Sequence, residues 1–438
     1  MQNLENNQKQ SNMQKVALTA LAGTSIEWYD FFLYGAAAAL IFPTAFFGEM
    51  PPTTALLLSL LTFAAGFIAR PIGGIIFGHF GDKVGRKKTL ISALMLMGIS
   101  STLIGLLPTY AMIGVAAPIL LTSLRFAQGL AIGGQWGGAM LLVTESAPSN
   151  QRGYYGAFAQ AGAPIGVILA NLALIITSAL VSEEFFNTWG WRIPFLASAV
   201  LILISMYIQL NLEDTDAFKA LVNNKGAQSD ENIKKSPVIE AIKKYPKRIF
   251  LAAGAFLSVQ VTFYILIAFM LAYGVTSANM ARDDMLAAVL IASAIMVPIQ
   301  FVFSSYSDRH GRKGIFMLGA VLTGIWAFAI FPLVDTGNFY LIVLAITGGL
   351  VFLAMMYGPQ AAFFTELFST EVRYSGATLG YQFGAIVGGA FAPTIAVKLW
   401  TEFDIIWVSA YIALASLLTL LSVMALTETY QSDLNNTD

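Results

Sequence analysis

The chain has 438 residues, of which 57% are hydrophobic and only 11% charged, and its mean hydropathy is +0.70. Soluble domains carry roughly 25% charged residues, so this composition excludes a soluble globular protein and predicts a lipid-facing surface. The net charge of −1 gives no reason to expect a nucleic-acid partner, and the absence of cysteine excludes disulfides, thiolate metal sites and a cysteine nucleophile.

Twelve apolar stretches are long enough to cross a bilayer, which takes about 20 residues in a helix. A polar segment rich in Asn and Gln precedes the first stretch and lacks the pattern of a signal peptide. The sequence therefore predicts an all-α integral membrane protein with twelve transmembrane helices. The expected spans are 17–42, 54–80, 89–107, 115–144, 154–180, 191–211, 249–275, 284–305, 314–333, 339–364, 375–398 and 404–426.

A long polar segment within the chain separates six spans from six. A charged turn, Asp82 to Lys87, recurs about half a chain later as Asp308 to Lys313. Such a repeat predicts two pseudo-symmetric six-helix bundles, an architecture typical of transporters. The expected units are an N-terminal tail (1–16), a first bundle (17–211), a linker (212–248), a second bundle (249–426) and a C-terminal tail (427–438).

The basic residues predict the orientation in the membrane. Placing both termini in the cytoplasm puts 19 of the 24 Lys and Arg residues on that side, and only Arg282 and Lys398 on the other. Cytoplasmic loops carry an excess of Lys and Arg, so we expect both termini to be cytoplasmic.

Three ionisable residues fall deep inside the expected spans. Arg70 lies about 18 Å from Asp82 at the helix end, which is near the middle of a hydrocarbon core about 30 Å thick. Asp30 and Arg125 fall at a similar depth, and Glu27 lies one turn from Asp30. Intramembrane charges are costly and usually functional. The simpler alternative is a static ion pair between helices.

These charges suggest a proton-linked site for an anion. The arginine fork matches a carboxylate, and the protonation of a buried Asp or Glu responds to the charge of a neighbouring Arg. We therefore predict that Asp30, Glu27 and Arg125 couple transport to protons, and that Arg70 and Arg125 bind the substrate.

The second half has no charge at mid-depth in the expected spans, and offers amides and phenols instead. These side chains suit recognition of a substrate's hydroxyls or body, although interhelical hydrogen bonds and aromatic packing are the simpler alternatives. The remaining candidate substrate-binding residues are Tyr29, Gln135, Trp136, Gln260, Tyr264, Tyr357, Gln360, Tyr381 and Gln382.

The repeated turns indicate a gate at the cytoplasmic ends of the helices. Their acidic residues suit helix capping or pairing with the arginines that follow them, although positive-inside topology alone explains the basic residues. A second repeat pairs a Glu with an Arg seven residues later in each half. The candidate gate residues are Asp82, Arg86, Glu145, Arg152, Asp308, Arg312, Glu366 and Arg373. With only two histidines, we expect no metal site.

Several motifs resemble the major facilitator superfamily. They are Gly78-x-x-Gly81-Asp82-Lys83-x-Gly85-Arg86-Lys87 and Arg125-x-x-Gln128-Gly129-x-x-x-Gly133-Gly134. Further stretches, such as Glu27-Trp28-Tyr29-Asp30-Phe31 and Trp189-Gly190-Trp191-Arg192-Ile193-Pro194-Phe195, are similar to its metabolite:proton symporter family. The resemblance covers roughly residues 20–425 and implies alternating access in a bacterial inner membrane. That family commonly has Glu where this chain has Gln135, which cannot titrate.

The sequence therefore favours a proton symporter that imports a small organic acid or zwitterion, such as the shikimate, citrate, 2-oxoglutarate, proline or betaine taken by that family. We expect a monomer with no cofactor beyond the proton gradient. The alternative is a proton-linked exporter of amphipathic compounds, for which Gly162-x-Pro164-x-Gly166 is a faint signal. An enzyme is not expected, because the spans show no nucleophile–base set.

Overall fold

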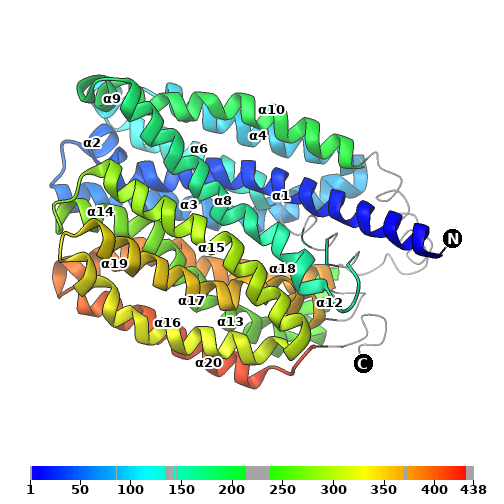
Figure 1. Ribbon diagram of the computed structural model, residues 1–438. Helices are drawn as coiled ribbons and strands as arrows, with labels where there is room; N and C mark the ends of the chain where they lie inside the picture. Colours follow the sequence, from blue (N-terminus) through cyan, green and yellow to red (C-terminus); the bar gives the residue numbers. More distant parts are fainter. Residues whose placement is uncertain are drawn as a thin grey trace.

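The computed structural model describes the backbone of residues 2–84, 86–133, 140, 143–144, 147–213, 237–368 and 373–430. Side chains are described for residues 13–77, 88, 91–133, 140, 143–144, 147–207, 241–368, 373 and 375–430. Every regular element in this part of the chain is a helix (Figure 1). Both termini lie at one end of the helix bundle, and α2 and α9 lie at the other.

The first half of the chain forms six long helices joined by short ones. The long helices are α1 (Gln2–Leu40), α3 (Pro52–Val84), α4 (Arg86–Leu106), α6 (Ala116–Gly133), α8 (Arg152–Leu180) and α10 (Ile193–Glu213). The short connections are α2 (Phe42–Phe47), α5 (Tyr110–Ile113), α9 (Glu183–Thr188) and the 3₁₀ turn η1 (Gly190–Arg192). Because α1 begins at Gln2, residues expected to form an N-terminal tail extend the first helix.

The second half repeats the arrangement, with two interrupted spans. One is built from α13 (Pro246–Tyr264), the π-helix η2 (Ile265–Phe269) and α14 (Met270–Thr276), and the other from α18 (Arg373–Gly384), the π-helix η3 (Ala385–Ala390) and α19 (Ala392–Glu402). The continuous spans are α15 (Arg282–His310), α16 (Arg312–Val334), α17 (Phe339–Glu366) and α20 (Ile406–Ala425). A short helix, α12 (Pro237–Lys244), precedes this bundle.

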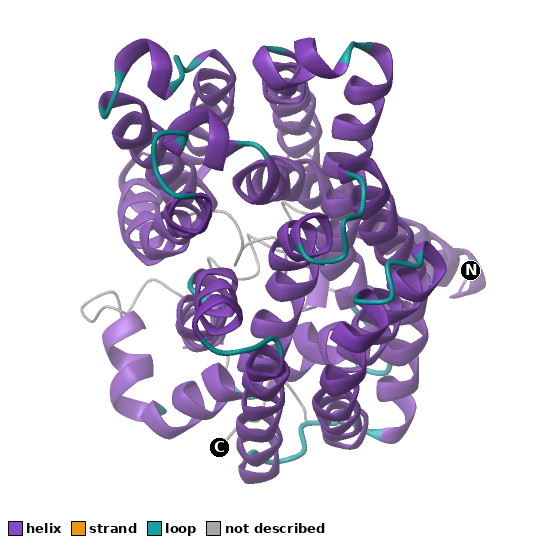
Figure 2. Cartoon of the chain, turned by 90° about the vertical axis from the view of Figure 1, so that its left-hand side faces the viewer, coloured by secondary structure: helices purple, strands orange, loops and turns teal. Residues whose placement is uncertain are grey.

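The helix lengths and hydropathy agree with a membrane protein of this design. Ten helical segments of the described chain are long and apolar enough to span a bilayer, and a shorter apolar helix covers Ile91–Leu106. The remaining expected span is α1, whose hydropathy is lowered by Glu27 and Asp30. Viewed from the end opposite the termini, the helices run largely end-on (Figure 2).

Glycines bring α3 and α6 into backbone contact. A Cβ atom at Gly133 would collide with the carbonyl oxygen of Arg70, and one at Gly129 with that of Gly66. Small residues permit such close helix packing in membranes. The two helices that carry Arg70 and Arg125 are therefore held side by side.

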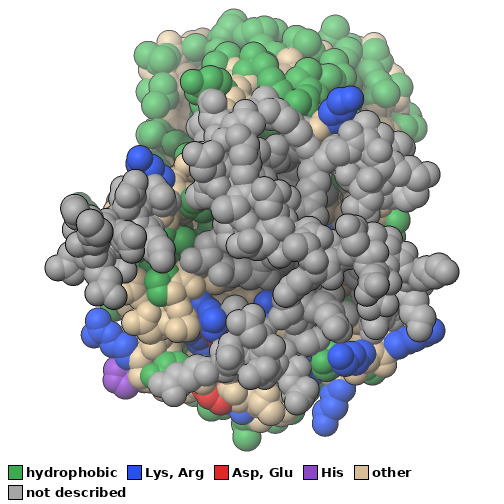
Figure 3. Space-filling view, turned by 90° about the vertical axis from the view of Figure 1, so that its right-hand side faces the viewer, with side chains coloured by type: hydrophobic (Ala, Val, Ile, Leu, Met, Phe, Trp, Pro, Cys, Tyr) green, Lys and Arg blue, Asp and Glu red, His purple; other side chains and the backbone are tan. Residues whose placement is uncertain are grey.

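The two bundles meet along α8 and α15, which lie next to each other in Figure 1. Buried amides join this seam at three points. Asn171 Nδ2 donates to the Leu286 carbonyl oxygen at 3.1 Å, Gln300 Nε2 to that of Ala157 at 3.3 Å, and Gln160 Nε2 to that of Tyr357 on α17 at 3.2 Å. Lys and Arg side chains surround the end that carries the termini (Figure 3).

Candidate functional site

A small cavity lies between the bundles at the middle of the helices. Its empty volume is about 270 Å³. None of the described lining residues carries a charge, and seven of the eleven are aromatic. The lining residues are Trp28, Phe32, Ala163, Phe256, Val259, Gln260, Phe263, Tyr264, Leu353, Tyr357 and Tyr381.

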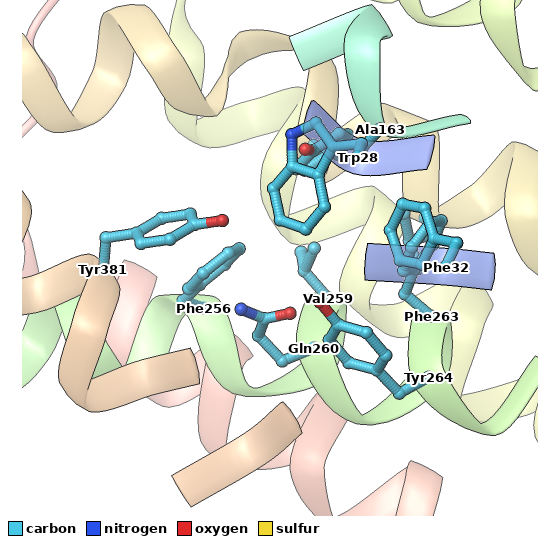
Figure 4. Close-up of a pocket in the computed structure, with 11 residues that line it drawn as sticks. Trp28, Phe32, Ala163, Phe256, Val259, Gln260, Phe263, Tyr264 and Tyr381 are labelled. Atoms are coloured by element: carbon cyan, nitrogen blue, oxygen red, sulfur yellow. The ribbon is translucent and has the colours of Figure 1, made fainter. Parts of the chain in front are cut away.

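Four of the residues predicted to bind substrate line this cavity: Gln260, Tyr264, Tyr357 and Tyr381. The Gln260 amide and the Tyr381 hydroxyl point into the central space, opposite the Trp28 ring (Figure 4). Gln260 is only 4% exposed, and its Nε2 has no hydrogen-bond partner. A buried donor without a partner is costly, and here it faces the space a ligand would fill.

Arg70 lies directly behind this aromatic wall. Its guanidinium carbon is 4.4 Å from the ring centroids of Phe31 and Phe67, and 5.4 Å from that of Trp28. Arg70 also lies near the Tyr264 hydroxyl. Its Nε and Nη2 atoms are buried without partners. Ring faces stabilise the cation, while the free N–H groups remain available to an anion.

Arg125 occupies a second aromatic cage, one layer deeper in the first bundle. Its guanidinium carbon is 4.2 Å from the Phe31 centroid, 4.3 Å from Tyr34 and 4.7 Å from Phe63. Its Nη1 donates to Gln128 Oε1 at 3.1 Å. Nε and Nη2 have no partner. A Cβ atom at Gly66 would lie only 2.8 Å from Arg125 Nε, so this glycine makes room for the guanidinium.

Asp30 lies beside the Arg125 cage. The carboxylate is 1% exposed, and neither of its oxygens has a hydrogen-bond partner. Ser198, Ser101 and Arg125 lie near the carboxylate. Among the described residues, no salt bridge within 4.0 Å joins Asp30 to either arginine. The structure thus brings the three groups together without the static ion pair of the simpler alternative. Glu27 is half-buried.

Other predicted residues do not line the cavity. The Tyr29 hydroxyl donates to the carbonyl oxygen of Pro194 on α10 at 2.8 Å, so Tyr29 packs inside the first bundle. Gln360 and Gln382 are buried, and each has side-chain atoms without a partner, but neither reaches the cavity. Gln135 and Trp136 lie outside the described residues. Trp28, which was not among the candidate residues, forms part of the cavity wall.

The π-helices lie beside this site. η2 begins immediately after Tyr264, and a Cβ atom at Gly389 of η3 would lie 2.9 Å from the Tyr264 ring and 3.0 Å from that of Phe67. Gly389 therefore lets the second bundle approach α3 of the first bundle closely. π-helical turns are rare and frequently occur at functional sites.

At the end that carries the termini, Asp308 connects the bundles. Its Oδ1 and Oδ2 accept hydrogen bonds from the backbone N–H groups of Gly153 and Tyr154, each at 2.8 Å. These are the first turn of α8, where unpaired N–H groups and the helix dipole favour a negative charge. Asp308 of the second bundle thus caps a helix of the first.

Arg312 organises the remaining charges at this end. It forms salt bridges with Asp308 at 2.6 Å and Glu366 at 3.1 Å, and Glu366 lies 3.9 Å from Arg152. Arg373 Nε donates instead to the carbonyl oxygen of Phe368 at 3.2 Å. The structure therefore brings together Arg152, Asp308, Arg312 and Glu366 of the predicted gate. The side chains of Asp82, Arg86 and Glu145 lie outside the described residues.

A segment after α20 completes this charge cluster. Thr429 Oγ1 donates to Glu366 at 2.8 Å, and the Glu428 carboxylate accepts the backbone N–H groups of Arg312 and Lys313, each at 3.0 Å. Partial burial opposes ionisation of Glu428, but hydrogen bonds from four backbone N–H groups, those of Lys313, Arg312, Tyr430 and Thr429, outweigh it and lower its pKa.

The opposite end is also closed, by a cluster that sequence reasoning missed. Ser178 of α8 donates to Asp283 of α15 at 2.9 Å. Arg282 donates to Ser178 at 2.9 Å and to Asn187 at 3.3 Å, and lies 4.0 Å from the Phe186 ring. Arg282 is one of only two basic residues expected on that side, and this rarity could have marked it as a candidate in the sequence. The two bundles are thus joined at both ends of the helices.

Comparison with known proteins identifies the family. Residues 20–381 match the family model described as Major Facilitator Superfamily. The chain belongs to the major facilitator superfamily. It is therefore a multi-pass membrane transporter and not an enzyme.

Relatives of this major facilitator protein include the inner membrane metabolite transport protein YhjE of Escherichia coli (strain K12), which is 40% identical over 97% of this chain and 96% of that protein. The shikimate transporter of the same strain is 38% identical over 92% of each chain. The proline/betaine transporter of Escherichia coli (strain K12) is 33% identical, over 91% of this chain and 80% of that protein.

Solved structures confirm the fold of this major facilitator transporter. The proton:xylose symporter XylE bound to 6-bromo-6-deoxy-D-glucose superposes with a TM-score of 0.72 at 17% identity, covering 98% of both chains. XylE from E. coli in a partially occluded inward open conformation gives a TM-score of 0.70, covering 97% of this chain and all of that chain. The predicted helical architecture of two bundles is thus confirmed.

Proposed function

We propose that this transporter imports a small organic acid or zwitterionic metabolite together with protons, by alternating access. The observation that carries the proposal is the group of three buried charges, Asp30, Arg70 and Arg125, which lie within the first bundle, with Arg70 against the cavity wall, and form no salt bridges to one another. Unpaired charge at this depth is expensive, so it calls for a ligand that completes it. The relatives that carry metabolites, shikimate and proline or betaine support this class of substrate.

Charge balance explains how substrate and proton are linked. With Asp30 ionised, the three groups sum to +1. A substrate carboxylate on Arg70 lowers the sum and weakens the positive field that keeps Asp30 ionised, so Asp30 then favours a proton. Binding one anion and one proton returns the sum to +1. The loaded and empty sites therefore carry the same charge, which suits movement of both through one cycle.

Alternating access requires each end to open in turn. Opening the end near the termini breaks the Asp308 cap on α8 and separates Arg152 from Glu366. Opening the other end breaks the contacts of Arg282 and Asp283 with Ser178. We infer that the end with the termini faces the cytoplasm of a bacterial inner membrane, since it carries most of the Lys and Arg residues.

The exporter hypothesis gains one feature from the structure, because an aromatic wall suits amphipathic compounds. The small volume and the arginine behind the wall favour a compact anion or zwitterion instead. Flux in proteoliposomes separates the two: an imposed inward proton gradient drives accumulation by a symporter and depletion by an antiporter.

Asp30→Asn tests the coupling. Purified protein is reconstituted into proteoliposomes, and uptake of radiolabelled shikimate, proline and glycine betaine is measured with and without a pH gradient. We expect Asp30→Asn to retain exchange counterflow and to lose gradient-driven accumulation. Asp284→Asn, at an exposed position at the start of α15, is the matched control and should accumulate like the wild type. Accumulation by Asp30→Asn at the wild-type level would show that Asp30 does not couple transport to protons.

A further inference from the structure

We propose that Phe31 separates the functions of the two arginines. The substrate binds Arg70 alone, and Arg125 acts with Asp30 in proton coupling. The site then takes a molecule with a single carboxylate, whose compact body packs on aromatic faces, and discriminates against dicarboxylates and tricarboxylates. This inference rests on the proposed function and adds the number of anionic groups that the site accepts.

Both guanidinium groups lie against the Phe31 ring. Its centroid is 4.4 Å from Arg70 Cζ and 4.2 Å from Arg125 Cζ, and the residue is 1% exposed. Phe63 and Phe67 extend this partition, with centroids 4.9 Å and 5.3 Å from that of Phe31. An aromatic face attracts a cation on each side, so one ring both accommodates the two positive charges and blocks the path between them.

Neither arginine lines the cavity itself, but Arg70 contacts its wall. Arg70 contacts Trp28 and reaches Tyr264, and both of those residues line the cavity. Arg125 is surrounded by Phe31, Tyr34 and Phe63, none of which lines it. A substrate entering between Trp28 and Tyr264 therefore meets the unpartnered Nε and Nη2 of Arg70 and stops at Phe31.

Arg125 lies against Phe31 and has hydrogen-bond partners of its own inside the first bundle. Its Nη1 donates to Gln128, and Gln128 Nε2 donates in turn to Ser101 Oγ at 2.7 Å. Ser101 also lies beside Asp30. Arg125, Gln128, Ser101 and Asp30 thus form one polar group inside the first bundle, separate from the cavity.

The cavity wall has no place for a second carboxylate. Its described lining has no charge, and its polar groups are the Gln260 amide, three phenols and the Trp28 indole N–H. A second anionic group would be buried without a cation, at a large cost. A ring, an alkyl body or an ammonium fits against the aromatic faces, and Gln260 Nε2 is a free donor for a hydroxyl or a carboxylate oxygen. The wall therefore selects one anionic group with a compact body.

Equilibrium binding to the purified protein in detergent tests this selection. The probes are shikimate, proline and glycine betaine, with one carboxylate each, against succinate and citrate. We expect at least one monocarboxylate to bind at least about 10-fold more tightly than succinate and citrate. Equal or tighter binding of succinate or citrate would overturn the inference while leaving an organic-acid transporter intact. If no carboxylate binds, the proposed function fails together with the inference.

Matched arginine variants test the division of tasks. Arg70→Gln should weaken binding of the preferred monocarboxylate by about 10- to 100-fold, because charge-assisted hydrogen bonds are lost. Arg125→Gln should leave its Kd within about threefold, and should abolish accumulation driven by a pH gradient in proteoliposomes. Similar losses of affinity in both variants would overturn the partition.

Replacing Phe31 tests the ring itself. Phe31→Ala opens a path to Arg125 and should improve the affinity for succinate, relative to the preferred monocarboxylate, by about 10-fold. Phe31→Leu keeps an apolar barrier of similar volume and should change that ratio by less than about threefold. The same ratio in both variants and in the wild type would overturn the role of Phe31. If Phe31→Ala does not fold, the two arginine variants still decide the inference.

Discussion

Two groups of buried charge in this transporter differ in one respect, the presence of partners. At the end near the termini, Arg312 is 1% exposed and makes salt bridges with both Asp308 and Glu366. At mid-depth, Arg70 is equally buried, yet has nitrogen atoms without any partner. Burial alone therefore does not reveal the purpose of a charge. The paired charges join the bundles, whereas the unpaired charges are those that we propose to bind substrate and proton.

This difference also separates stability from activity. A protein tolerates a destabilising group at the place where function requires it. Mutations in the gate cluster should therefore lower the free energy of unfolding. Mutations that remove a charge from the mid-depth cluster should not lower it. Substitutions in the two regions are expected to change the free energy of unfolding in opposite directions.

The largest effect is expected from Arg312→Met. It removes the cation and leaves Asp308 and Glu366 buried and uncompensated, which should lower the free energy of unfolding by about 3–5 kcal/mol. Denaturant unfolding of the purified protein in detergent, followed by circular dichroism, measures the loss. A change below about 1 kcal/mol would show that the cluster is solvated and does not stabilise the closed end.

Asp30→Asn should have the opposite sign. The substitution keeps the shape and removes a buried charge without hydrogen-bond partners, so the free energy of unfolding should stay the same or rise by up to about 2 kcal/mol. Denaturant unfolding followed by circular dichroism measures this change as well. The same variant should lose proton-coupled accumulation. A clear loss of stability would mean that Asp30 is a structural residue like Asp308.

Glu428 provides a pH-dependent test of the gate cluster. Because its folded-state pKa is lowered from the ordinary value of 4.5, its stabilising contribution is present above that ordinary value and is lost as the pH falls through the lowered folded-state pKa. Glu428→Gln should lower the free energy of unfolding by about 0.3–1 kcal/mol at neutral pH and low salt. The difference from the wild type should shrink on acidification, and a difference independent of pH would contradict the assignment.

The smallest effect is expected from Lys398→Gln. Lys398 and Glu402 form an exposed pair 3.7 Å apart, and such pairs contribute about 0.2–0.5 kcal/mol. Thermal melting should therefore hardly change, and added salt should remove the difference. A loss comparable to that of Arg312→Met would break the distinction between buried and exposed pairs.

The sequence was sufficient for the architecture and for part of the site. Charges in apolar stretches are conspicuous, which is why Asp30, Arg70 and Arg125 were found without a structure. Gln260 and Tyr264 carried the same signal of polarity within a span. The repeated turn revealed two halves, because duplication preserves local spacing.

Local sequence does not report which way a side chain faces or what it meets across the bundle. Trp28 and Tyr29 are neighbours, yet one helical step directs Trp28 to the cavity and Tyr29 to Pro194 on α10. Asp308 caps a helix of the other bundle by accepting a hydrogen bond from Gly153, 155 residues earlier in the chain. The π-helix η3 depends on tertiary packing, since Gly389 lies against Tyr264 and Phe67. Such features follow from long-range contacts, which the spacing of residues in the sequence does not predict.

The cap that Asp308 provides to α8 also makes the amides of Gly153 and Tyr154 an intrinsic reporter of the transport cycle. Whenever the end near the termini opens, these two N–H groups lose their acceptor and face water. Their rate of hydrogen–deuterium exchange then measures the fraction of time spent open. A substrate that favours one side of the membrane would be visible as a change at two neighbouring amides, without any label attached to the protein.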